Sequence, residues 1–239
     1  MSDQLLSAVH LTGPRGLPEN GLRTLRRFVT PWFDRRWEIH QRGVHHVPKE
    51  GPVILASNHI GWLDGPLLFL KAPRPAHALV KTEIFEGRTG KLLTYAGQIP
   101  INRARTDAGA LRTAADALAA EQVVIVYPEG GRGDGELRQI KNGVAWLALV
   151  SGAPIVPVAM FGTREPGGAS ESRPPKGARI DMVYGEPIRF PAMPWPRTAE
   201  MIGDVAEQVL EHMRLHLTWS KGAAKRGLPG PMPSESTSD

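Results

Sequence analysis

The sequence contains no cysteine. This absence excludes a disulfide framework, a thiolate metal ligand and a cysteine nucleophile. We also expect no secretory signal, because no basic start is followed by an apolar core of about seven residues. The lack of cysteine is compatible with a reducing compartment, and we expect a cytoplasmic protein.

Aromatic residues are few, with three tyrosines and six phenylalanines. No basic stretch is interleaved with aromatic residues as in RNA-binding sheets, so we expect no nucleic-acid partner. The glycine-rich stretch at 130–135 lacks the Gly-Lys-Ser/Thr ending of a nucleotide-binding P-loop. His59, Asp64 and Glu129 carry groups that suit zinc. No second histidine lies at a close helical spacing, so we expect no metal.

One long stretch, residues 142–163, contains no charged residue and is long enough to suggest a membrane span. Its middle, however, contains the turn-forming residues Ser151, Gly152, Pro154 and Pro157. Because such residues interrupt helices, the pattern favours a buried helix at 143–150, a turn, and a buried strand at 154–161.

The protein has 239 residues and a net charge of +5, and most of this charge lies near the N-terminus. Between Arg15 and Arg42 there are seven arginines and three acidic residues. Apolar residues recur at threes and fours from Leu22 to Gln41, which predicts an amphipathic basic helix over 21–42. This helix either docks on an anionic membrane surface or packs its apolar face on the rest of the protein. We expect peripheral binding to the inner face of a membrane.

From residue 43 onward, short apolar runs alternate with helical patterns. Strands are predicted at 52–56, 77–81, 99–102, 123–127, 154–161, 179–183 and 187–190. Helices are predicted at 65–71, 88–96, 107–120, 143–150 and 200–217. The alternation predicts an α/β domain at 43–219, with helices covering both faces of a central, mostly parallel or mixed sheet. We expect a flexible lead-in at 1–20 and a disordered tail at 220–239.

The most informative motif is Asn58-His59-Ile60-Gly61-Trp62-Leu63-Asp64. On a regular helix, His59 and Asp64 would lie about 140° apart and could not face each other. The segment must therefore bend, which Gly61 permits, and Gly65-Pro66 after the aspartate predicts a helix that begins there. In this geometry Asp64 can bind one imidazole nitrogen, which leaves the other free to take a proton from an alcohol.

Three further blocks form or follow predicted strands, where sites commonly lie in α/β sheets. They are Gly97-Gln98-Ile99-Pro100-Ile101-Asn102-Arg103, Val126-Tyr127-Pro128-Glu129-Gly130-Gly131-Arg132-Gly133 and Ala153-Pro154-Ile155-Val156-Pro157-Val158. Four glycines between residues 130 and 135 allow backbone to approach an anion closely.

Together the four blocks resemble those of the glycerolipid acyltransferase family, whose best-known members are the lysophosphatidic acid acyltransferases. The family's first block is Asn-His, four residues, then Asp, which is matched by Asn58, His59 and Asp64. Its second block opens with glycine and ends in arginine, as do Gly97 and Arg103. The resemblance covers about residues 43–190.

The third block of the family is Phe-Pro-Glu-Gly-Thr-Arg. Here Tyr127 replaces the phenylalanine and Gly131 replaces the threonine, and the other positions match as Pro128, Glu129, Gly130 and Arg132. Asn102 stands where an acidic residue is frequent. The fourth block is an apolar strand with proline, and a downstream pair, Lys141 and Gly143, is also similar.

The resemblance implies transfer of a fatty acyl group from acyl-CoA or acyl-carrier protein to 1-acylglycerol-3-phosphate, with no other cofactor. His59 would act as the general base and Asp64 would orient it. Arg103 and Arg132 would bind the acceptor's phosphate, and Glu129 would orient the acceptor or the loop. Further substrate contacts are expected at Asn58, Gly130, Gly131 and Lys141.

Three alternatives stay open at this point. The acceptor could instead be glycerol-3-phosphate, a lysophospholipid or a glycolipid. A non-catalytic binder of acyl carriers or anionic lipids would keep the same fold. A thioester hydrolase would use water in place of the alcohol.

Overall fold

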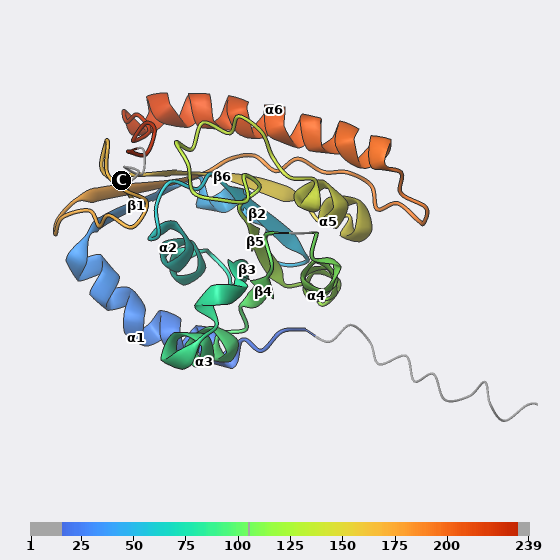
Figure 1. Ribbon diagram of the computed structural model, residues 1–239, viewed down its shortest axis with the longest axis horizontal. Coiled ribbons are helices and arrows are strands. Elements are labelled where there is room, and N and C mark those ends of the chain that lie inside the picture. Colours follow the sequence, from blue (N-terminus) through green and yellow to red (C-terminus); the bar gives the residue numbers. More distant parts are fainter. Residues whose placement is uncertain (1–15, 105, 234–239) are drawn as a thin grey trace, which may run out of the picture.

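A central seven-stranded sheet organises the protein. The computed structural model describes residues 16–104 and 106–233, and the strand order is β1-β7-β6-β2-β5-β3-β4 (Figure 1). The strands are β1 (Glu38–Arg42), β2 (Val53–Ser57), β3 (Ala76–Lys81), β4 (Ile99–Ile101), β5 (Val123–Val126), β6 (Ile155–Phe161) and β7 (Arg179–Tyr184).

Most of the sheet is parallel. Strands β6, β2, β5, β3 and β4 pair in parallel, whereas β7 is antiparallel to β6 and β1 runs parallel to β7. The C-terminal ends of the five parallel strands therefore meet at one edge of the sheet. This edge is where ligand sites form in open α/β sheets.

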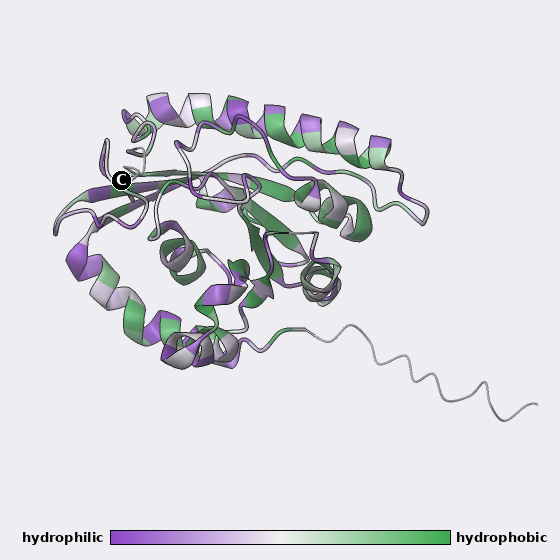
Figure 2. Ribbon diagram, in the orientation of Figure 1, coloured by the Kyte–Doolittle hydropathy of each residue, from purple (hydrophilic) through white to green (hydrophobic). Residues whose placement is uncertain are grey.

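Helices cover both faces of the sheet, as Figures 1 and 2 show. They are α1 (Asn20–Arg36), α2 (Asp64–Lys71), α3 (Gly87–Tyr95), α4 (Ala108–Ala119), α5 (Gly143–Ser151) and α6 (Ala199–Ala224), with short 3₁₀ helices at Val44–His46 and Thr82–Ile84. Ile54 and Val124 pack in the core under α4, α5 and α6. Their neighbours Leu55 and Ile125 pack in the opposite core with α1 and α2. Burial on both faces explains the uninterrupted apolar strands.

The predicted fold class is confirmed, and so are most of the elements. The helices and strands expected between 52 and 183 are present, with ends that differ by at most one residue. The uncharged stretch forms α5 and β6, as its turn residues predicted. The strand expected at 187–190 is wrong, because only an isolated bridge pairs Ile188 with Ile155. Across the described ranges 16–104 and 106–233, no helix has the length and apolar content needed for a membrane crossing.

The predicted N-terminal helix is too long. It ends at Arg36, because Trp37 has an extended backbone and is buried, with its indole N–H donating to the carbonyl of Pro174 at 3.0 Å. The next residues, Glu38–Arg42, form β1 beside β7. The boundary expected at residue 43 is therefore wrong, since the sheet begins with β1. Both Leu22 and Phe33 are buried, so α1 packs part of its apolar face on the domain.

The expected terminal segments are also corrected where the structure describes them. Helix α6 continues to Ala224, and its residues Ser220 and Ala224 are buried, so the tail predicted from 220 begins at least five residues too early. At the other end, the backbone N–H of Leu17 donates to the side-chain oxygen of Gln122, and the Leu17 carbonyl accepts from the amide nitrogen of the same side chain. The remaining parts of both predictions, at 1–15 and 234–239, lie outside the described residues.

Candidate active site

The turn that carries the two catalytic candidates, which we call the catalytic turn and define as residues 58–64, connects β2 to α2 at the C-terminal edge of the sheet. Its first residue, Asn58, is buried and binds the backbone of Met160 in β6 twice. The side-chain oxygen accepts from the Met160 N–H at 2.7 Å, and the amide nitrogen donates to the Met160 carbonyl at 3.2 Å. We therefore assign Asn58 to fixing the turn on the sheet, and not to the substrate contact expected from the sequence.

His59 and Asp64 face each other as the spacing predicted. The imidazole Nδ1 lies 2.8 Å from Asp64 Oδ2, and α2 begins at Asp64. The same carboxylate oxygen accepts the backbone N–H groups of Ile60 at 2.7 Å and Gly61 at 2.9 Å. An aspartate in the first turn of a helix suits the partial positive charge there. With Nδ1 donating to this buried carboxylate, Nε2 holds the free lone pair of the ring.

The third sequence block holds His59 from two further sides. The Tyr127 ring stacks on the imidazole, with centroids 4.2 Å apart and an angle of 26° between the rings. The backbone N–H of His59 donates to Glu129 Oε1 at 2.9 Å, and its carbonyl accepts from the Gly133 N–H at 2.9 Å. The general-base candidate is thus fixed by its ring face, its Nδ1 and its main chain.

Two of these neighbours have perturbed acidities. Burial raises the pKa of the Tyr127 phenol well above its ordinary value, so the hydroxyl stays neutral. Burial also raises the pKa of Glu129 to about 7, against the opposing effect of hydrogen bonds from the backbones of His59 and Leu137. Glu129 therefore titrates near neutral pH while its carboxyl group faces the main chain of His59.

A cavity of about 1190 Å³ lies in front of the catalytic turn and includes His59 in its lining. Its walls contain apolar side chains from several elements, among them Phe69, Leu79, Ile84, Leu93, Ile101 and Trp146. Five of the predicted substrate-binding residues also line it, namely Arg103, Gly130, Gly131, Arg132 and Lys141. Apolar walls with a few placed polar groups suit a ligand that has both an acyl chain and a charged group.

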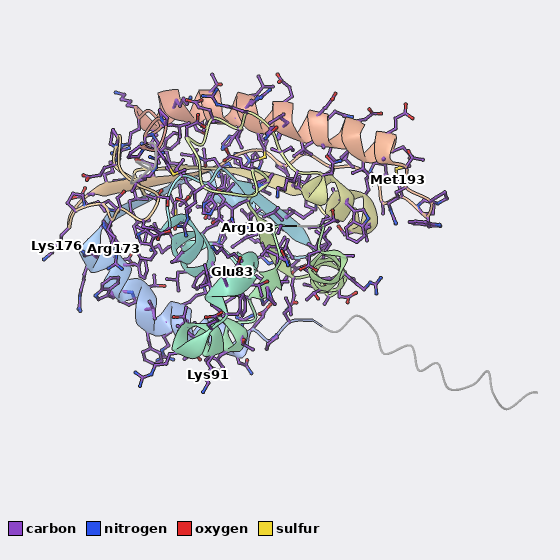
Figure 3. All side chains as sticks on the ribbon, viewed as in Figure 1. Glu83, Lys91, Arg103, Arg173, Lys176 and Met193 are labelled. Carbon is purple, nitrogen blue, oxygen red and sulfur yellow. The ribbon has the colours of Figure 1, made fainter. Side chains whose placement is uncertain are left out.

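We call Arg103, Arg132 and Lys141 the phosphate cradle, after the phosphate-binding role that the sequence predicted for the two arginines. Arg103 follows β4 (Figure 3) and donates to the carbonyl of Gly130 at 3.1 Å, while the Lys141 ammonium lies 3.5 Å from the Arg103 carbonyl. Gly130 has a φ of 74°, and a Cβ atom there would lie 2.4 Å from Lys141 Cε. The positive φ favours glycine at this point of the loop, and a side chain there would also have to push the end of Lys141 aside. These contacts join the second and third sequence blocks into one site.

The loop between β6 and β7 supplies a partner for the cradle. Arg132 forms an ion pair with Glu171, whose side chain is 73% exposed. On the same loop, Arg173 places its guanidinium over the Trp62 ring at 4.9 Å, and Figure 3 marks this residue. Because Ser170 and Glu171 line the cavity, the loop forms one of its walls.

Sequence reasoning missed two residues that follow β6. The Thr163 hydroxyl donates to Asp64 Oδ1. The buried Arg164 donates to four carbonyls, at 2.8 Å to Ile60, 3.0 Å to Gly133, 2.7 Å to Gly168 and 2.6 Å to Gly230. Their signal was a polar pair shortly after an apolar strand, but it lacked the spacing to a second functional side chain that identified His59.

Comparison with known proteins agrees with this site. The family described as Acyltransferase matches residues 38–161, about half of the chain. The 1-acyl-sn-glycerol-3-phosphate acyltransferase alpha of Ovis aries is 36% identical over 129 residues, which cover 51% of this chain and 44% of the relative. The 1-acyl-sn-glycerol-3-phosphate acyltransferase of Limnanthes alba is 34% identical over 130 residues, covering 52% and 46%. The chain thus spans about half the length of the curated relatives it matches.

The fold has a counterpart among solved structures. The crystal structure of the 1-acyl-sn-glycerophosphate (LPA) acyltransferase PlsC from Thermotoga maritima superposes with a TM-score of 0.57 at 21% identity. The superposition covers 81% of this chain and 79% of that one. The sequence match and the shared fold lead to one conclusion: this chain belongs to the acyltransferase family that contains the 1-acyl-sn-glycerol-3-phosphate acyltransferases.

Proposed function

We propose that the protein moves a fatty acyl group from a thioester, acyl-CoA or acyl-carrier protein, to the hydroxyl of 1-acylglycerol-3-phosphate, forming phosphatidic acid. The observation that carries this proposal is the His59–Asp64 pair at a large apolar cavity that the phosphate cradle also lines. The names of the similar proteins from Ovis aries and Limnanthes alba support the choice of acceptor.

His59 is the general base in this mechanism. Its Nε2 removes the proton of the acceptor hydroxyl while the oxygen attacks the thioester carbonyl, a contribution of roughly 10²–10⁴-fold in rate. The resulting tetrahedral intermediate collapses, the carbon–sulfur bond breaks, and the departing thiolate takes the proton from the imidazolium. Asp64 keeps the imidazole in the required tautomer and stabilises its charged form. The protein needs no covalent nucleophile, because the substrate supplies the hydroxyl.

The phosphate cradle binds the acceptor's phosphate. Arginine suits this task because its planar group donates two parallel hydrogen bonds and stays charged. In the described structure Arg132 is paired with the exposed carboxylate of Glu171, so the incoming phosphate either replaces that carboxylate or binds beside it. Glu129 contributes indirectly, because its carboxyl group accepts the backbone N–H of His59 and fixes that residue.

We further propose that α1 and α3 form the face that binds an anionic membrane on its cytoplasmic side. Two aromatic side chains of α1 are exposed, Phe28 at 72% and Trp32 at 56%. The helices touch, since a Cβ atom on Gly21 would lie 1.9 Å from the carbonyl oxygen of Tyr95. Exposed aromatic residues beside basic ones are typical of interfacial helices. Leu93 of α3 also lines the cavity, so this helix contributes to both the proposed face and the cavity wall.

The first test measures thiol release from acyl-CoA with a panel of acceptors: 1-acylglycerol-3-phosphate, glycerol-3-phosphate, a lysophospholipid, a glycolipid and water alone. We expect the fastest release with 1-acylglycerol-3-phosphate and a loss of about 10²–10⁴-fold for His59→Ala. The exposed His45→Ala is the matched control. Wild-type turnover by His59→Ala contradicts the proposed base, and fastest release with water alone identifies a hydrolase.

The membrane face is tested by flotation with vesicles that contain anionic phospholipid. The double variant Phe28→Ser, Trp32→Ser is expected to lose most binding. The control is Leu215→Ser, Trp219→Ser, which removes two residues that are each 62% exposed on α6, across the sheet from α1. Arg26 is left unchanged, because it binds the carbonyls after α2 and serves the fold. Equal loss of vesicle binding in both double variants would contradict the proposal that α1 is the membrane-binding helix.

A further inference from the structure

Asp64 uses its two carboxylate oxygens differently. Oδ2 binds His59 Nδ1 and the backbone N–H groups of Ile60 and Gly61, all within the catalytic turn. Oδ1 accepts from the hydroxyl of Thr163, which lies just after β6 and far away in the sequence. Both Asp64 and Thr163 are fully buried. The hydroxyl thus gives this carboxylate a hydrogen bond from outside its own turn.

The backbone around Thr163 also packs directly against the catalytic turn. A Cβ atom on Gly61 would lie 2.8 Å from the Thr163 carbonyl oxygen, so a side chain at that position would displace the threonine. The next residue, Arg164, donates from Nε to the carbonyl of Ile60 at 2.8 Å. The position of Thr163 relative to Asp64 is therefore set by backbone contacts as well as by the hydroxyl itself.

A carboxylate can rotate about its last bond unless both oxygens are held. The three bonds to Oδ2 anchor one side, and the Thr163 hydroxyl fixes the other, so the plane that meets the imidazole N–H is defined. Without the hydroxyl, Oδ1 would be a buried charged acceptor that lacks this donor, which is costly. The carboxylate could then turn toward another donor and leave the imidazole less well oriented.

We propose that Thr163 is a positioning residue for the acyl transfer, one that acts through Asp64 on the orientation and tautomer of His59. The assignment rests on the proposed function in that the imidazole is taken as the base. It makes the arrangement a chain of three side chains, hydroxyl to carboxylate to imidazole, whose first member never touches substrate. The family match ends at residue 161, so this threonine lies outside it.

The test compares Thr163→Val, which keeps the shape and removes the donor, with Thr163→Ser, which keeps the donor. We expect kcat to fall about ten- to hundredfold in Thr163→Val, the range for loss of a hydrogen bond to a charged group, while the KM values for donor and acceptor stay within about twofold. Thr163→Ser should regain most of the rate. Thr218→Val, which removes a hydroxyl from an exposed turn of α6, is the control.

A second readout does not need activity. The proton on His59 Nδ1 gives a downfield NMR resonance, and we expect Thr163→Val, but not Thr163→Ser or Thr218→Val, to move or broaden it. If Thr163→Val fails to fold, Thr163→Ala replaces it in both measurements. A loss confined to KM, or an unmoved resonance with wild-type kcat, overturns the assignment.

Two controls separate this proposal from the proposed function. If the protein shows no acyl transfer at all, the proposed function fails while the resonance still tests the link from Thr163 to His59. In the background of Asp64→Asn, Thr163→Val should cost little further rate, because both changes break the same chain. A full additional loss there means that Thr163 acts by another route.

Discussion

The catalytic turn and the phosphate cradle line the same cavity but are built in opposite ways. In the turn, Asp64 is fully buried and receives hydrogen bonds from two backbone amides, a hydroxyl and the imidazole. In the cradle, Arg132 is paired only with an exposed carboxylate, and Arg103 with a loop carbonyl, among the described residues. Under the proposed function, the groups that carry out the chemistry are arranged before substrate arrives, whereas the substrate's phosphate completes the recognition site.

The largest expected effect comes from breaking the turn at its centre. Asp64→Asn keeps the shape of the side chain but removes the charge that selects the imidazole tautomer, so kcat should fall by about 10²–10⁴-fold. Steady-state kinetics with saturating acceptor measures this loss. Asp34→Asn, in an exposed pair with Lys71, serves as the control. A loss that appears only in KM would mean that the turn binds substrate and does not orient a base.

A change in the phosphate cradle should affect KM more than kcat. Arg132→Ala is expected to raise the KM for the phosphate-bearing acceptor about ten- to hundredfold, since a charge-assisted pair to phosphate is lost, with a smaller change in kcat. Arg138→Ala changes an arginine of the same loop that is 79% exposed and bonded to Asp134, and it should stay near wild type. If Arg132→Ala lowers kcat alone, the cradle does not serve mainly to bind the acceptor, and the proposed separation of binding from chemistry is wrong.

Glu129 accepts a hydrogen bond from the main chain of His59 and directly precedes Gly130 in the chain. Its carboxyl group should make the stability of the protein depend on pH. Its pKa is raised by burial from the usual 4.5 to about 7, so between these values the folded protein holds a proton that the unfolded chain has released. The free energy of unfolding therefore falls as pH rises from about 4.5 to about 7, by about 2 kcal/mol when partial exposure is allowed for.

Urea unfolding at several pH values measures this slope. Glu129→Gln should remove it, and the exposed Glu83→Gln (Figure 3) should not. An unchanged slope in Glu129→Gln would show that another group carries the titration. A slope of opposite sign would mean that the buried carboxyl is stabilised in its charged form.

The smallest expected effect lies at the ring behind His59. The Tyr127 hydroxyl is buried and has no hydrogen-bond partner among the described residues, so Tyr127→Phe should stabilise the protein by about 1 kcal/mol and leave kcat unchanged. Tyr127→Leu removes the stacked ring, which is worth about 0.5–1.5 kcal/mol, and should lower kcat several-fold. Thermal unfolding and steady-state kinetics check both. If Tyr127→Phe loses activity, the hydroxyl has a role that the stacking does not explain.

The sequence predicted those parts of the site that depend on neighbours in the chain. The bend between His59 and Asp64 follows from five residues and a glycine, and the structure has it. Thr163 could not be paired with Asp64 in advance, because the contact depends on β6 lying beside β2. The short apolar runs located both strands but not their order in the sheet.

The errors at the ends of the protein have the same origin. Glu38–Arg42 continued the arginine-rich pattern of α1, and only pairing with the distant β7 makes it a strand. The segment after α6 is rich in glycine and proline, which predicted disorder. Arg164, reaching it from the interior, instead gives Gly230 a hydrogen-bond partner that composition cannot reveal.

The guanidinium group of Arg164 affects how changes near the C-terminal end of the described residues should be designed. It joins the carbonyl of Gly230 to that of Ile60, the residue after His59, and Met232 lines the cavity. A tag or deletion placed at residues 225–233 is therefore expected to disturb the turn that carries His59, although the sequence predicted a disordered tail. A variant trimmed at the end of α6 should be judged by its turnover and not by its yield.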